Sequence, residues 1–294
     1  MSSMFRAPDC LLIRVGELAL KSDPVQQRMF SMLVDNIRAA LKGQDFKFEL
    51  MMNRIFIYTD TKKAIKKLQK VFGIFSISPA WVCQSNLDEI KVLAVDVAKK
   101  VLKLNPKKSF AIRPHRVGNH DFTTRTIAEE AGAAVKITTC AKVDLSKPDV
   151  EIFIETRTSR AYIYSEKIPC AGGMPLGSSG KAAAIVDSKE AAVAAWLMMK
   201  RGVEMLFFVS VKAKPFVKKL KNWHVGRSMK VYDMKYLVKL EELYEERKIQ
   251  AVVASSVVNK NIKVQLSSLS ILLLQPTDGW KAADLRKLTQ NIEL

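Results

Sequence analysis

The sequence is poor in the residues that hold metals and form disulfides. Among its 294 residues are three histidines and four cysteines, which are Cys10, Cys83, Cys140 and Cys170. Structural zinc sites usually show closely spaced Cys or His pairs, and these cysteines lie far apart. We therefore expect no metal site. We expect free, buried thiols in a protein of a reducing compartment.

Long apolar runs are also missing. No stretch of the sequence approaches the ~18 consecutive apolar residues that a membrane-spanning helix requires. The N-terminal segment MSSMFRAPDCLLIRVGE has too short an apolar core and too early an acid for a secretory signal. The sequence therefore predicts a cytoplasmic protein with no membrane partner.

Acidic residues are strongly outnumbered. The chain has 48 Lys and Arg against 29 Asp and Glu, which gives a net charge of +19 and a pI near 9.8. Such an excess attracts polyanions and releases their counterions on binding, so it favours nucleic acid as a partner. A generally basic proteome is the alternative explanation. No basic amphipathic segment with exposed aromatic residues indicates a membrane surface.

Apolar periodicity predicts small mixed α+β units in the front part of the chain. We expect a strand and loop over residues 10–20, an amphipathic helix over 25–43 and a hairpin over 46–59. The elements expected next are a helix at 61–73, a strand at 74–83, a helix at 87–104, a strand at 109–117, a helix at 122–139 and a hairpin at 149–168.

The pattern changes after a connector rich in Gly, Pro and Ser, PCAGGMPLGSSGK, at residues 169–181. Apolar strand candidates then alternate with helical stretches, and this alternation predicts a doubly wound parallel sheet. The expected strands are 182–186, 203–211, 228–234, 250–258 and 270–276.

Five cationic or titratable side chains fall within thirteen positions of the segment SFAIRPHRVGNHDFTTRT. They are Arg113, His115, Arg116, His120 and Arg125. Because a proline cannot donate to a sheet ladder, we expect the strand to end at residue 114 and the cations to spread over a loop. Thr123 or Thr124 is expected to cap the next helix, whose N–H groups add positive potential. Such a cluster suits phosphate binding, and a solvated basic loop is the alternative.

Several motifs, in this order, resemble those of the tRNA 4-thiouridine synthetase (tRNA sulfurtransferase) family. They are RVGELALKS, FAIRPHRVGNHDFTTR, KVDLSKPDVEIFIE, AYIYSEKI, AGGMPLGSSGK and LMMKRGVE, and the resemblance covers roughly residues 10–211. It implies an N-terminal ferredoxin-like domain, a THUMP RNA-binding domain that recognises the tRNA acceptor region, and a C-terminal ATP pyrophosphatase (PP-loop) domain.

We place the ferredoxin-like domain at residues 1–60, the THUMP domain at 61–170 and the PP-loop-like domain at 171–294. We expect tRNA as the partner. The candidate RNA-binding residues are Lys21, Arg113, Arg116, His120, Arg125 and Lys142, with Lys66 and Lys181 as further candidates.

The family's phosphate loop, Ser-Gly-Gly-x-Asp-Ser, is not preserved. Aligned on LMMKRG, its positions are occupied by Val186, Asp187, Ser188, Lys189, Glu190 and Ala191. In the family's loop, glycines let the backbone approach a pyrophosphate and serine hydroxyls donate to its oxygens. This turn has neither the glycines nor serines at those two positions. Asp187 and Glu190 have the spacing of an Asp-led capping box, which would place two carboxylates where ATP phosphates would lie.

The sequence also has no cysteine after Cys170, although the family's sulfur chemistry uses a thiolate in the C-terminal domain. We therefore expect a tRNA-binding protein with no catalytic residues and a degenerate nucleotide loop, with ATP as a cofactor only if the altered loop still binds it. One alternative is an active ATP-dependent tRNA thiolase supplied by an external sulfur donor. Another is a scaffold for an intact paralogue or for self-association.

Overall fold

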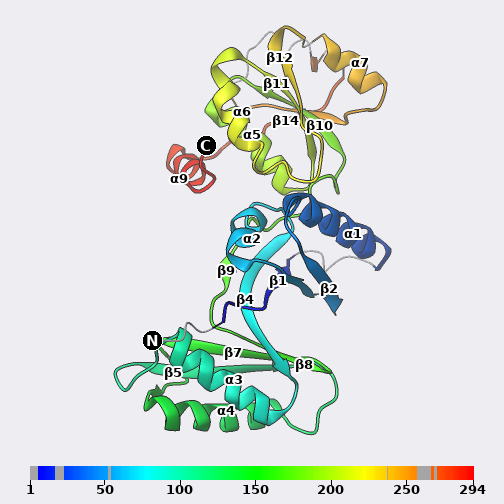
Figure 1. Ribbon diagram of the computed structural model, residues 1–294. Helices are drawn as coiled ribbons and strands as arrows, with labels where there is room; N and C mark the ends of the chain where they lie inside the picture. Colours follow the sequence, from blue (N-terminus) through cyan, green and yellow to red (C-terminus); the bar gives the residue numbers. More distant parts are fainter. Residues whose placement is uncertain (1–5, 17–22, 52–53, 237, 257–265, 268–269) are drawn as a thin grey trace. The chain divides into compact units, whose positions relative to one another are not determined.

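The computed structural model describes residues 6–16, 23–51, 54–236, 238–256, 266–267 and 270–294 (Figure 1). The contacts within the chain divide it into two compact units. The first unit takes the chain up to Ile13, then Gln44–Ile65 and Ser76–Ile168. The second takes Arg14–Gly43, Lys66–Phe75 and Pro169–Leu294. Each unit is therefore assembled from three separate stretches of the chain.

A mixed sheet with the strand order β2-β3-β1-β4-β8-β7-β5-β6 organises the front of the chain. The two predicted hairpins are confirmed, since β2 pairs with β3 and β7 pairs with β8 in antiparallel fashion. The strands are β1 (Cys10–Val15), β2 (Lys47–Met51), β3 (Arg54–Tyr58), β4 (Ile74–Gln84), β5 (Ser109–Arg116), β6 (Lys142–Val143), β7 (Val150–Thr156), β8 (Arg160–Tyr164) and β9 (Ile168–Pro169).

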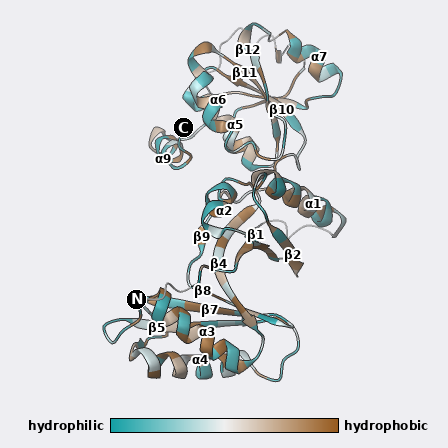
Figure 2. Cartoon of the chain, in the orientation of Figure 1, coloured by the Kyte–Doolittle hydropathy of each residue, from teal (hydrophilic) through white to brown (hydrophobic). Residues whose placement is uncertain are grey.

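Helices α3 and α4 cover one face of this sheet and close its main core. In α4 the fully buried side chains Ile127, Ala131 and Val135 recur every four residues and pack in one cluster with Ile112 of β5 and Ile152 of β7. Hydrophobic and hydrophilic colours both appear along α4 (Figure 2). The helices of this half are α1 (Asp23–Ala40), α2 (Thr61–Leu68), α3 (Leu87–Asp96), which continues as a π-helical turn Val97–Val101, and α4 (Thr124–Thr139).

The start of α4 is fixed by a capping box, and Thr123 is the capping residue of the two predicted candidates. Its Oγ1 accepts a hydrogen bond from the Thr126 N–H at 3.1 Å. The Thr126 hydroxyl accepts in turn from the Thr123 N–H at 3.3 Å. Two N–H groups that a helix start leaves unpaired are therefore satisfied within the protein.

Strand β5 continues past Pro114, so the prediction that the ladder ends there and the cations fan out on a loop is wrong. In the parallel pairing with β7, Pro114 lies opposite Ile154 and Arg116 lies opposite Thr156. Strand β6 pairs with β5 only at Ser109 and Phe110, so within the described strands the other side of β5 is an edge at Pro114. A proline is tolerated at such an edge because no donor is needed there.

The second unit contains the predicted doubly wound sheet, in which the described strands are all parallel and follow the order β12-β11-β10-β13-β14. The strands are β10 (Lys181–Val186), β11 (Glu204–Val209), β12 (Lys230–Asp233), β13 (Ala251–Val253) and β14 (Leu273–Leu274). The helices are α5 (Lys189–Lys200), α6 (Lys214–Leu220), α7 (Lys239–Glu245) and α9 (Ala282–Asn291), with 3-10 turns at Val211–Ala213 and Met234–Tyr236.

Both faces of this parallel sheet are buried, as the apolar run in β10 requires. Ala182, Ala184 and Val186 point into the cluster that includes α5 and α6, whereas Ala183 and Ile185 point into the cluster that includes α7. The alternation follows from the two-residue period of a strand. None of the helices in the described ranges combines the length and apolar character needed to cross a membrane.

The four cysteines are all free, and the expectation that they are buried holds only in part. Cys10 is buried, and burial raises the pKa of its thiol well above the ordinary range. Burial also raises the pKa of the Cys83 thiol to about 12. Cys140 is exposed; it is the C-cap of α4 and has the left-handed conformation, with φ of 54°.

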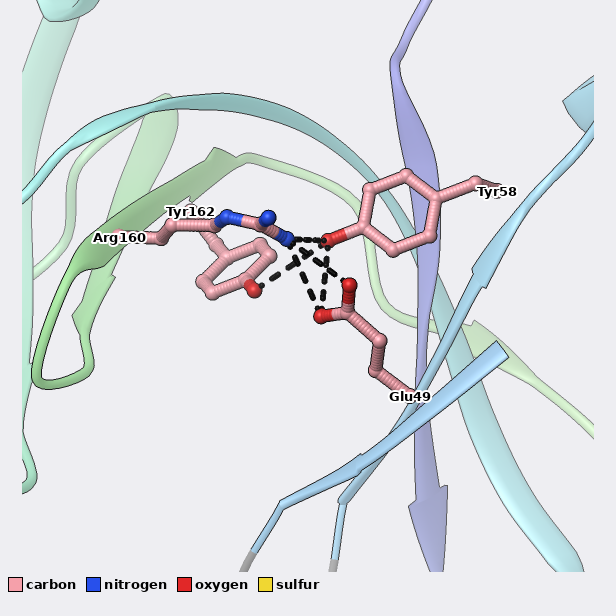
Figure 3. Close-up of polar contacts among 4 residues, drawn as sticks. All are labelled: Glu49, Tyr58, Arg160 and Tyr162. Atoms are coloured by element: carbon pink, nitrogen blue, oxygen red, sulfur yellow. Dashed lines mark hydrogen bonds and ion pairs between the residues drawn. The ribbon is translucent and has the colours of Figure 1, made fainter. Parts of the chain in front are cut away.

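A polar cluster of Glu49, Tyr58, Arg160 and Tyr162 ties the β2–β3 hairpin to β8 within the first unit (Figure 3). The Arg160 Nη1 donates to both Glu49 carboxylate oxygens at 3.1 Å and to the Tyr58 hydroxyl at 2.8 Å. Tyr162 is fully buried, and its hydroxyl lies 3.5 Å from that of Tyr58. Burial is the largest cause that raises the pKa of both phenols.

The raised pKa values predict a specific loss of stability at alkaline pH. The neutral phenols are favoured in the folded state, so this stabilisation is complete below the unfolded tyrosine pKa of about 10 and falls as pH rises above it. In calorimetry between about pH 9 and 11, the melting temperature of Tyr162→Phe should fall less steeply than that of the wild type. Tyr236→Phe, which changes an exposed ring, should follow the wild type. Equal slopes for all three proteins would contradict this assignment.

Candidate nucleic-acid interface and the carboxyl edge of the parallel sheet

The cations of β5 differ in how freely they face solvent. Arg113 is held by the protein, since its Nε donates to Glu151 Oε1 at 2.7 Å and its Nη2 donates to the Leu145 carbonyl at 2.8 Å. Arg116 is exposed and makes one weak contact, 3.4 Å from its Nη1 to the His120 carbonyl. Arg116 is therefore better placed than Arg113 to meet a phosphate.

His120 is part of the turn that follows β5. Its ring lies on Phe122, with ring centroids 4.9 Å apart, and its Nδ1 and Nε2 lie 3.4 Å from Ser85 Oγ and 3.3 Å from the Val117 carbonyl. Both ring nitrogens and one ring face are thus engaged inside the protein. The ring shapes the turn beside Arg116.

The other predicted binders are distributed over the surface. Arg125 is exposed at the start of α4 and pairs with Glu129 at 2.7 Å. Lys142 is exposed on β6, opposite Ser109, so it lies seven residues and on the order of 23 Å along β5 from Arg116. Lys21 lies outside the described residues. Lys66 is exposed on α2, and Lys181 pairs with Glu204 at 3.4 Å in the second unit.

His115 was predicted to belong to the cationic cluster but was not among the candidate RNA-binding residues. It is exposed on β5 and, by strand alternation, lies on the opposite face from Arg116. One exposed cation of this surface was missed. Lys107, in the loop before β5, is exposed close in sequence to the Lys142 pairing site. The adjacent lysines at 107–108 of the sequence could have indicated this exposed positive charge.

A buried ion pair supports the end of β7, next to β5. Arg157 donates from Nε (3.1 Å) and Nη2 (2.5 Å) to Glu155 Oε1, and both side chains are less than a tenth exposed. Arg54 lies 3.6 Å from the same carboxylate oxygen. A buried charge of this kind persists only when it is paired. Arg157 is thus a structural arginine, and the charge pattern of the sequence did not distinguish it from the exposed ones.

In the second unit, the turn from β10 into α5 lies at the carboxyl edge of the sheet. Ser188 is the N-cap of α5, because its Oγ accepts from the Ala191 N–H at 3.2 Å. The predicted Asp-led capping box at Asp187 and Glu190 is therefore wrong by one position. The third helical residue is Ala191, whose methyl group cannot accept the hydrogen bond that would complete a box.

Glu190 makes a different contact. Its Oε1 accepts a hydrogen bond of 2.8 Å from the hydroxyl of Ser256, which follows β13. Strands β10 and β13 are neighbours, and the chain order reverses between them, because β11 and β12 lie on the other side of β10. In doubly wound folds, ligands bind at this point, outside the carboxyl ends of the strands.

The flanking positions of the turn are core residues. Val186 is 0% exposed and Ala191 is 1% exposed, and both pack in the cluster that contains α5. Lys189 points outward and is exposed. The residues that the alignment on LMMKRG assigns to the two serine positions of the family's loop are thus buried in the hydrophobic core.

Comparison with known proteins identifies the front half. The family model of the ThiI ferredoxin-like domain matches residues 10–78, and that of the THUMP domain matches residues 84–166. The tRNA sulfurtransferase of Pyrobaculum aerophilum is 38% identical over 233 residues, which cover 76% of this chain and 48% of that protein. The chain belongs to the tRNA sulfurtransferase family. It spans about half the length of the curated family members it matches, as with the 52% of the probable tRNA sulfurtransferase of Methanobrevibacter smithii.

Solved structures extend the similarity to the C-terminal sheet. The Pyrococcus horikoshii protein PH1313 is 25% identical, with a TM-score of 0.84 over 97% of this chain and 99% of that one. A 4-thiouridine synthetase, solved with RNA and ATP, is 20% identical, with a TM-score of 0.81 over 96% of this chain and 84% of that one. The predicted fold class, with ferredoxin-like, THUMP and parallel-sheet parts, is confirmed.

The cap at Ser188 makes a testable prediction about the start of α5. Ser188→Ala should lower the free energy of unfolding by about 1 kcal/mol, because it leaves the Ala191 N–H without its acceptor. Asp187→Ala is the matched control and should change stability by less than about 0.5 kcal/mol. Urea unfolding of the two variants measures the difference. A larger loss in Asp187→Ala would restore the Asp-led cap.

Proposed function

We propose that this family member binds tRNA through the THUMP-containing unit, and that the carboxyl edge of its C-terminal sheet no longer holds ATP. The observation that carries the first part is the exposed cationic surface at the end of β5 and the start of α4, on a chain with a net charge of +19. The THUMP match at residues 84–166 supports a nucleic-acid partner for that surface.

The geometry of the surface suits a phosphate backbone better than base-specific contacts. Arg116 lies on a strand that is paired through its last residue, so its backbone is already ordered when a phosphate arrives. Arg125 faces solvent in the first turn of α4 and can exchange Glu129 for a phosphate oxygen. Lys142, far along β5, extends the surface. Contacts of this type neutralise phosphates and position a folded RNA.

The second part of the proposal follows from the side chains at the turn between β10 and α5. A nucleotide cradle needs glycines and free N–H groups, whereas the Ala191 N–H here is capped by Ser188. Asp187 and Glu190 bring negative charge, and like charges at ~4–6 Å cost on the order of 1 kcal/mol each after screening. Lys189 offsets part of this charge. These residues do not fit a triphosphate.

A second candidate function is tRNA thiolation with sulfur supplied by another protein. The names of the homologues favour it, since they are tRNA sulfurtransferases. It requires an external thiolate, because the sequence has no cysteine after Cys170. Purified protein incubated with tRNA, Mg-ATP and a persulfide donor would form 4-thiouridine under this candidate and would leave tRNA unmodified under the first.

The RNA surface predicts a change in the salt dependence of tRNA binding. Arg116→Gln should raise the Kd for tRNA by roughly three- to tenfold and reduce the slope of log Kd against log salt by about one unit, because one phosphate contact is lost. Arg286→Gln, which removes an exposed arginine from α9 in the second unit, is the control for charge alone. Filter binding at several salt concentrations measures both. Equal effects of the two substitutions would remove the proposed surface.

A further inference from the structure

The second unit contains a groove of about 780 Å³ that lies away from the carboxyl edge of its sheet. Its walls come from the end of α2, from α5 and from the segment after α9. The residues that give it its character are Lys66, Lys70, Lys200, Trp196, Trp223 and Glu293. We call it the Trp–Lys groove. Lysines outnumber carboxylates in this set by three to one.

The two indoles hold two of the lysines in place. Lys200 follows Trp196 by one helical turn on α5, and its Nζ lies 5.4 Å from the Trp196 ring centroid. Lys70 Nζ lies 5.7 Å from the centroid of Trp223. The rings themselves are anchored by Phe72, whose centroid is 5.6 Å from Trp196 and 5.7 Å from Trp223. Ammonium groups are thus preorganised on a rigid aromatic floor.

A carboxylate of the protein already occupies part of this cationic site. Glu293 Oε2 lies 2.6 Å from Lys70 Nζ, and the hydrogen bond from Lys70 is the main cause that lowers the pKa of the Glu293 carboxyl. A second contact holds the segment after α9 that carries Glu293, since Trp223 Nε1 donates to the Ile292 carbonyl at 3.3 Å. The Glu293 side chain is 71% exposed, so it can leave without opening the core.

The floor of the groove also has an unused donor. Trp196 is 4% exposed, and its Nε1 has no hydrogen-bond partner among the described residues. Unpaired buried donors of this kind are uncommon in native structures. Excess positive charge in the groove thus lies beside an indole whose buried N–H is unsatisfied.

We propose that the Trp–Lys groove binds a phosphate group and that Glu293 is a built-in competitor for it. The indole faces are too buried for a base to stack on them, because Trp196 and Trp223 are 4% and 8% exposed, so the recognised part of the ligand is the anion. Lys66, Lys70 and Lys200 all line the groove, and the Glu293 carboxylate pairs with Lys70, so a phosphate with more charge and more oxygens than a carboxylate can compete for these ammonium groups. The site is separate from the Arg116 surface and does not depend on the proposed function.

The phosphate can belong to a free phosphorylated molecule or to an RNA backbone, and one experiment separates these sources. Tripolyphosphate is titrated into the full chain by calorimetry, with and without saturating tRNA. Lys200→Gln should raise the Kd at least fivefold, and Glu293→Gln should lower it about threefold or more, because the competing charge is removed. Lys62→Gln changes an exposed lysine of α2 that does not line the groove and should leave the Kd within twofold. Melting temperatures of the variants establish that each is folded.

Displacement of tripolyphosphate by tRNA would assign the groove to an RNA phosphate, and its retention would assign the groove to a small ligand. Both outcomes support phosphate binding. An absence of tripolyphosphate binding in both the wild type and Glu293→Gln would overturn the site. Binding that Glu293→Gln leaves unchanged would overturn the competitor role, and equal losses in Lys200→Gln and Lys62→Gln would show only non-specific attraction. None of these outcomes changes the test at Arg116.

Discussion

The hydrogen bonds at the start of α5 constrain what the C-terminal sheet can do. Ser188 takes the Ala191 N–H, and Glu190 joins Ser256 across the point where the strand order reverses. Those N–H groups and that opening between two strand ends are what a phosphate would need. In this chain the same turn also serves the packing of the sheet, because Val186 and Ala191 are buried in the core beside α5.

The cationic surface of the first unit depends on a different constraint, the pairing of β5 through Arg116. A strand fixed along its whole length by β7 presents Arg116 without the entropy cost of ordering a loop. Arg113 belongs to the same strand, yet its bonds to Glu151 and Leu145 make it part of the scaffold. Two arginines of one strand thus differ according to the partners within reach, since Arg113 is bonded to the protein and Arg116 stays exposed.

Much of the fold could be predicted from the sequence, because local patterns determine it. The two hairpins were predicted from short apolar strand patterns, the parallel strands from apolar runs separated by helical stretches, and Thr123 was one of two named caps. The predictions that were wrong concern positions whose local structure depends on more than the local sequence pattern. Pro114 stays in its strand because β6 is short, and Ser188 rather than Asp187 caps α5 because the backbone points its hydroxyl at the helix. The Trp–Lys groove joins Lys70, Trp196 and Glu293, which no local pattern connects.

The most direct test of the account is a crystal structure of the protein grown with Mg-ATP in the absence of tRNA. The account predicts that the start of α5 keeps its Ser188 cap and the hydrogen bond between Glu190 and Ser256, with no phosphate oxygen bonded to the N–H groups of residues 187–191. A triphosphate seated on that turn, with the two bonds broken, would contradict it.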